Sequence, residues 1–140
     1  MARKQKIREP GIHASSKRKM AIARGTLKKG KGNVWINSIL LNAYGSELAR
    51  ERVREPLTLS KPHSEEVDIK INVKGGGWNS QAEAVRSVIA KTILKHSKNE
   101  DLRKKFVAYD RQLLVADTRR TEPQKPYRSG ARSKRQTSKR

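Results

Sequence analysis

The sequence predicts an α+β fold, a single compact domain in which helices cover one layer of β-sheet. Residues 67–74 alternate apolar and polar side chains, the period of a strand with one buried face. Three glycines follow, and then the longest amphipathic helical pattern of the chain. The 140 residues, 34% hydrophobic and 4% aromatic, suit one small domain with a modest core.

The first predicted strand begins near Lys17. Its larger apolar side chains are expected to face inward: Met20, Ile22 and Leu27. A glycine-rich turn at residues 29–33 follows, where Gly30 and Gly32 permit the positive φ of a tight turn. We therefore expect residues 34–39 to form a second strand that completes a hairpin with the first.

A short helix is predicted over residues 47–54. Ser46 can accept a hydrogen bond from a backbone N–H of its first turn. Leu48 and Val53 are expected to face inward, and Pro56 to end the helix.

The longest helix is predicted to start with a capping box formed by Ser80 and Glu83. Its charged residues, Arg86 among them, fall mainly outside the apolar stripe. The stripe itself should face the sheet and consists of Ala82, Val85, Val88, Ile89, Thr92 and Ile93.

A last helix is predicted after Asn99, with acidic residues in its first turn and basic residues later, the order that complements the helix dipole. Its apolar side is formed by Leu102, Phe106 and Val107. Residues 113–115 are predicted as a last buried strand. Since core-forming residues end at Asp117, we expect a globular domain over residues 17–117.

The net charge of +21 is concentrated at the two ends of the chain. Residues 1–16 are predicted as a basic arm without regular structure, and residues 118–140 as an extended basic tail with nine cations and one carboxylate. Such segments order on a polyanion. The 23 residues of the tail can span at most about 75 Å, which is enough to thread into a large RNA.

Several classes of function are not expected. The chain has no cysteine and its longest apolar runs are four residues, so we expect neither a thiolate metal site nor a membrane span. Its three histidines lack ligand spacing, and no serine sits in a nucleophile elbow. The sequence thus predicts no metal, no cofactor and no enzymatic activity.

Two glycine-rich segments allow different interpretations. Residues 25–32, GTLKKGKG, match seven of the eight positions of a nucleotide-binding P-loop, but Gly32 stands where a hydroxyl should bind Mg²⁺. A turn whose Lys31 contacts RNA is favoured. Residues 75–77 form either a tight backbone bend or a contact to an RNA phosphate at a helix start. Trp35 can likewise pack in the core or stack on a base.

Five blocks of sequence, in order, resemble one family. They are SKRKMAIAR at 16–24, GKGNVWIN at 30–37, VKGGG with QAEAVRSVIA at 73–90, AYDRQLLVADTRRTEPQKP at 108–126, and the final SKR. Together they resemble the universal ninth protein of the small ribosomal subunit, and the ADTRRTEPQKP block resembles its archaeal and eukaryotic branch. The pattern departs at Ser80, where the family usually has glycine, and at Thr137, near which an aromatic residue is common.

The resemblance implies a structural constituent of the head of the small subunit in the cytoplasmic ribosome, with a left-handed βαβ crossover like that of the second domain of the fifth small-subunit protein. The partners it implies are ribosomal RNA, neighbouring proteins of the head and the anticodon stem-loop of P-site tRNA. The tRNA contact falls on Ser138, Lys139 and Arg140. Together with the turn and glycine candidates above, the expected ribosomal-RNA contacts are Lys17, Arg18, Lys19, Lys31, Gly75, Gly76, Gly77, Arg119, Arg120, Lys125, Arg128, Arg132, Lys134 and Arg135.

A different class of function fits the same charge. A basic protein that coats any nucleic acid would have the same arm and tail, but would not prefer ribosomal RNA to a bulk duplex. Some small-molecule kinases share the fold that the resemblance implies, yet the phosphate loop they need is incomplete here.

Overall fold

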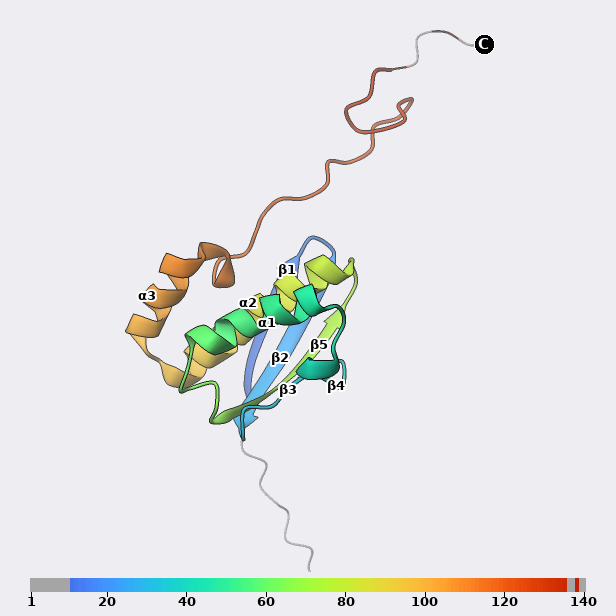
Figure 1. The fold of residues 1–140 in the computed structure, drawn as a ribbon. Helices are drawn as coiled ribbons and strands as arrows, with labels where there is room; N and C mark the ends of the chain where they lie inside the picture. Colours follow the sequence, from blue (N-terminus) through green and yellow to red (C-terminus); the bar gives the residue numbers. More distant parts are fainter. Residues whose placement is uncertain (1–10, 136–137, 139–140) are drawn as a thin grey trace, which may run out of the picture.

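A computed structural model describes residues 11–135 and 138, in which helices lie against one face of a five-stranded sheet (Figure 1). The strand order is β1-β2-β5-β3-β4. Neighbouring strands are antiparallel except β3 and β5, which are parallel. The elements in chain order are β1 (Ile12–Arg18), β2 (Ala21–Lys29), β3 (Val34–Ile36), β4 (Ile39–Leu40), the 3₁₀ turn η1 (Leu41–Ala43), α1 (Glu47–Leu59), β5 (Val67–Lys74), α2 (Trp78–Ser97), α3 (Glu100–Tyr109) and the 3₁₀ turn η2 (Arg111–Leu113). The predicted α+β architecture of one sheet under helices is confirmed.

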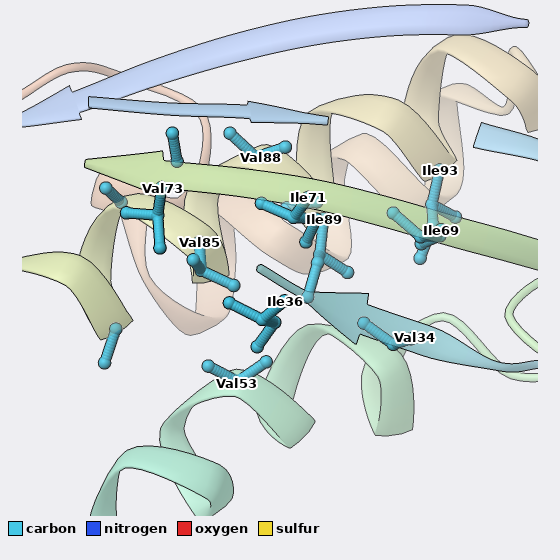
Figure 2. Close-up of a cluster of buried hydrophobic side chains, with 14 of the residues drawn as sticks. Val34, Ile36, Val53, Ile69, Ile71, Val73, Val85, Val88, Ile89 and Ile93 are labelled. Carbon is cyan, nitrogen blue, oxygen red and sulfur yellow. The ribbon is translucent and has the colours of Figure 1, made fainter. Parts of the chain in front are cut away.

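The core lies between this sheet and the two helices α1 and α2, as Figure 2 shows. The alternation predicted for β5 is confirmed, because Val67, Ile69, Ile71 and Val73 are all buried. Every residue of the apolar stripe predicted for α2 is buried as well. These two patterns therefore define the two layers that meet in the core.

The N-terminal hairpin differs from the sequence prediction in two respects. Regular structure begins at Ile12, within the segment expected to be an irregular arm, because β1 pairs with β2 along its whole length. The inward residues of β2 are also one position away from those predicted: Met20 and Ile22 are exposed, whereas Ala21 and Ala23 are buried. Leu27 faces inward as predicted.

Small side chains on β2 let helix α2 approach the sheet closely. A Cβ atom on Gly25 would stand 2.4 Å from Val88 Cγ1 of α2. The limited space under α2 thus determines which face of β2 is buried. The positions of the largest apolar side chains do not.

The predicted hairpin between β2 and β3 is wrong, because β5 lies between them in the sheet. Asp68, near the start of β5, accepts hydrogen bonds from the backbone N–H groups of Lys31 and Asn33 at 2.9 and 3.0 Å. These bonds, chiefly that from Lys31, lower the pKa of Asp68 below its ordinary value. They hold the β2–β3 loop across β5, so β3 pairs with the far edge of that strand.

Helix α1 starts as predicted but runs beyond its predicted end. Ser46 Oγ accepts a hydrogen bond from the backbone N–H of Ala49 at 3.4 Å. The helix continues through Pro56 to Leu59, and Ser60 closes it by donating its N–H and hydroxyl to the Pro56 carbonyl. Val53 is buried as predicted, whereas Leu48 is exposed and Ala49 takes the inward position.

Helix α2 begins at Trp78, and the predicted capping box is absent. Glu83 instead lies inside the helix and forms an ion pair with Arg52 of α1 at 3.1 Å. Arg86, predicted to point outward, is buried between ion pairs of 2.7 Å to Glu55 and to Asp110. The helices are therefore joined by charges as well as by apolar contacts.

Helix α3 is capped by Asn99 as predicted, since its side chain accepts a hydrogen bond from Asp101 N–H at 2.9 Å. Leu102 and Phe106 are buried, but Val107 is exposed.

The last buried strand predicted at 113–115 is wrong. Asp110 accepts a hydrogen bond from Gln112 N–H at 2.8 Å and starts the turn η2, which buries Leu113 and leaves Val115 exposed. From residue 118 to 135 the chain contains no helix or strand and runs away from the domain (Figure 1). No helix in the described ranges has the length and apolarity to cross a membrane.

Candidate nucleic-acid interface

The predicted RNA-binding residues of the domain lie at two opposite ends of the sheet. Lys17, Arg18 and Lys19 stand at the β1–β2 turn, next to the end of β5, because Ile22 pairs with Lys74. The glycine segment and the start of the tail meet at this same end. Lys31 lies at the other end, in the β2–β3 loop.

The glycine segment bends tightly against the β1–β2 turn. Gly75 and Gly76 adopt φ values of +77° and +67°, and added Cβ atoms would stand 2.6 Å from the Met20 carbonyl oxygen and 3.0 Å from the Ala21 nitrogen. Close packing therefore accounts for these two glycines. Gly77 has open space around it and precedes α2 without a side-chain cap. The contact of the three glycines to an RNA phosphate stays a prediction.

The base of the tail is held to β1 through Asp117, whose side chain is only 8% exposed. Arg18 forms an ion pair with it at 2.6 Å. Arg119 donates its backbone N–H at 2.8 Å, and its guanidinium donates at 2.8 to 3.2 Å. The Arg119 hydrogen bonds, aided by the charge of Arg18, lower the pKa of Asp117 to about 2. Arg18 and Arg119, both predicted to contact RNA, thus hold Asp117 at the point where the tail leaves the domain.

Acidification should release this attachment. Because the pKa of Asp117 is lowered, from an ordinary 3.8 to about 2, its stabilising contribution is complete above about pH 4 and is lost as the pH falls through 2. In Arg119→Gln we expect the pKa of Asp117 to rise most of the way back to its ordinary value, and in Arg18→Gln we expect it to rise less. A carboxyl NMR titration of Asp117 measures both. Equal shifts, or none, would contradict this assignment of the causes.

The described part of the tail folds back on itself around Glu122. This carboxylate pairs with Lys125 at 3.2 Å and with Arg132 at 2.8 Å, and both cations lower its pKa. Arg135 lies over the Tyr127 ring, 5.5 Å from its centroid. Any RNA that bound these cations would have to replace these contacts.

The remaining predicted contacts are exposed, except for the half-buried Arg128, or lie outside the described residues. Arg120 donates to the backbone carbonyls of residues 117 and 119. The ammonium groups of Lys17, Lys19, Lys31 and Lys134 and the Arg128 guanidinium form no ion pair with another described residue. Ser138 is exposed. Lys139 and Arg140 lie outside the described residues.

The geometry bears on two chemical alternatives. A P-loop is excluded because Gly25 to Lys29 belong to strand β2 and no helix follows the loop after it. Within the described ranges, no group of three or more histidine, aspartate or glutamate side chains is placed to hold a metal ion.

A set of residues on the sheet face that the helices leave uncovered was not predicted from the sequence. Arg24 of β2 and Lys70 and Lys74 of β5 are exposed there, beside the partly exposed Trp35 of β3. The alternation predicted for β5 already marked Lys70 and Lys74 as outward-facing. It could not show that β5 brings them next to Trp35, since that pairing depends on the strand order.

The comparisons with known proteins all point to one family. The sequence model of a family described as ribosomal protein S9/S16 matches residues 16–140. A protein of Picrophilus torridus named small ribosomal subunit protein uS9 is 46% identical over 122 residues, which cover 87% of this chain and 92% of that protein. A protein of the same name from Methanococcus maripaludis is 43% identical over 129 residues, 91% of this chain and 96% of its own length.

Proposed function

Because the chain belongs to the ribosomal protein S9/S16 family, we propose that it is a structural constituent of the small subunit of the cytoplasmic ribosome, where it binds ribosomal RNA and contacts P-site tRNA. The family is structural and not enzymatic. The proposal agrees with the arrangement of charge, since cations of the domain and of the tail base gather at one end of the sheet. Neighbouring proteins of the subunit head are its further partners.

The domain positions the protein and the tail connects it to distant RNA. The observation that carries this division is the attachment of the tail base, through Asp117, to Arg18 of β1. Beyond that point the chain carries nine cations over a reach of at most about 75 Å. As they order on the RNA they release counterions, which makes binding steeply dependent on salt.

The finer features of the family are part of the same proposal. We take the β3–α1–β5 connection as the left-handed crossover, residues 17–117 as the domain, and residues 118–140 as the tail that threads through ribosomal RNA. Residues 1–16 form the N-terminal arm. Its residues 12–16 belong to β1 and pair with β2 of the domain. The parallel pairing of β3 with β5 supports a crossover of this kind.

The end of the tail is proposed to reach P-site tRNA. Deleting residues 138–140 should leave subunit assembly intact and weaken P-site tRNA binding roughly tenfold or more, because Lys139 and Arg140 would each contribute about 1 to 3 kcal/mol at most. Filter binding of tRNA to programmed small subunits measures the effect.

A full-length control separates charge from chain length. Lys139→Gln with Arg140→Gln keeps the backbone, so it should show most of the loss if charge is responsible. Subunits that assemble normally and bind P-site tRNA with unchanged affinity would refute the tRNA contact, while leaving the ribosomal-RNA role standing.

A further inference from the structure

One face of the sheet carries no helix from the described residues, and its outward side chains form a basic surface. The strand register places them in rows across the sheet: Lys17, Ile22 and Lys74 in one row, Ser15, Arg24 and Asn72 in the next, and His13, Thr26, Lys70 and Trp35 in the third. Lys28 and Asp68 follow at the edge of this face. We call this surface the open sheet face.

The charges of this face are almost all positive. It has five cations, Lys17, Arg24, Lys28, Lys70 and Lys74, and one carboxylate, Asp68. That carboxylate already accepts hydrogen bonds from the β2–β3 loop. Within the described chain, Arg24 and Lys74 form no ion pair or hydrogen bond through their side chains. On the helical side, in contrast, arginines pair with carboxylates. The open sheet face thus attracts a polyanion.

A groove on this face adds an aromatic ring to the cations. It has a volume of about 680 Å³ and is lined by Arg24, Trp35, Lys70 and Asn72 among others. Lys70 Nζ lies 5.5 Å from the centroid of the Trp35 ring. Trp35 faces the groove and not the core, because its neighbours Val34 and Ile36 are the buried residues of β3. Of the two interpretations of this residue, the one that leaves its ring available to a base is favoured.

We infer that the open sheet face binds unpaired RNA, with a base against Trp35 and phosphates on Arg24, Lys70 and Lys74. The inference rests on the proposed function, which supplies the RNA, and adds a surface separate from the tail. A sheet face that combines cations with an aromatic ring is suited to single strands, whose bases expose their faces for stacking. An acidic peptide would satisfy the cations but leave the ring and the Asn72 amide unused.

Fluorescence of the full-length protein can test the inference. Trp78, at the start of α2, is exposed, so Trp78→Phe leaves Trp35 as the single tryptophan. In this background, a single-stranded oligouridylate should quench Trp35 fluorescence in parallel with binding measured by anisotropy of the labelled RNA. A duplex RNA bound to the same occupancy, or polyglutamate, should quench it little.

A matched pair of charge variants locates the phosphates. Arg24→Gln with Lys74→Gln should flatten the dependence of log K on log salt by about 1.4, or about 0.7 for each lost single-strand contact. The control, Lys104→Gln with Lys105→Gln on α3, removes the same charge from exposed positions and should leave this slope and the quenching midpoint nearly unchanged.

The outcomes separate this inference from the proposed function. Unquenched Trp35 at saturating RNA, or equal effects of the two charge pairs, overturns the inference even if the protein enters small subunits normally. Quenching by polyglutamate as strong as by RNA also overturns it and assigns the face to an acidic protein segment. Quenching by RNA in a protein that never joins the subunit would sustain the RNA site while refuting the ribosomal role.

Discussion

Removal of residues 121–140 is expected to produce the largest loss of ribosomal-RNA affinity of any change to this protein. The deletion takes away seven cations and one carboxylate. If five of these cations reach phosphates, the slope of log K against log salt should become shallower by about 4. Binding isotherms of a small-subunit RNA fragment at several salt concentrations would measure it.

The deletion is placed to spare the base of the tail. It retains Asp117 with both of its arginine partners, so the melting temperature of the domain should not change. A full-length variant with glutamine at the seven basic positions separates charge from chain length and should reproduce most of the slope change. If the truncated and intact proteins show the same salt slope, the tail does not contact phosphates.

Replacement of Gly25 by valine should have the largest effect on the stability of the domain. Even a Cβ atom at this position would stand 2.4 Å from Val88 Cγ1, and Val88 is fully buried in α2. Such overpacking typically costs 1–3 kcal/mol, so we expect Gly25→Val to lower the free energy of unfolding by about 3 kcal/mol. Urea denaturation followed by circular dichroism measures the change.

Two further variants make this prediction specific. Arg24→Val puts the same side chain on the neighbouring position of β2, on the open sheet face, and should change stability by less than about 0.5 kcal/mol. Adding Val88→Ala to Gly25→Val should make the double variant more stable than the sum of the two single effects by about 1 kcal/mol or more. Additive losses would show that the helix does not limit the space at Gly25.

Local patterns in the sequence predicted the centre of the fold correctly. The alternation of β5 and the stripe of α2 each depend on residues a few positions apart, and one buried face sufficed to orient them. The caps Ser46 and Asn99 were predictable for the same reason, since each bonds within its own helix turn.

The errors arose where distant parts of the chain decide the structure. Met20 and Ile22 face outward because α2 lies close to the small residues of β2. The periodicity of a strand carries no information about that distance. β3 pairs with β5 because Asp68 holds the preceding loop across it. The capping box of Ser80 and Glu83 failed because α2 starts at Trp78, so both residues lie inside the helix, where Glu83 pairs with Arg52 of another helix.

The candidate interface was predicted unevenly for the same physical reason. The basic clusters of the β1–β2 turn and the tail are readable from composition. The attachment of Asp117 to Arg18 joins opposite ends of the chain, and the row from Lys70 to Trp35 depends on strand order, so neither was predicted from the sequence.

Sedimentation offers the best test of whether this chain is a constituent of the small ribosomal subunit. Cell lysate would be separated on a sucrose gradient at low magnesium, with and without moderate salt and nuclease, and each fraction probed for the protein. We expect the protein to comigrate with free small subunits and to stay with them in moderate salt. A broad distribution that collapses to the top of the gradient after salt or nuclease would contradict it, and would indicate a protein that coats nucleic acids without preference.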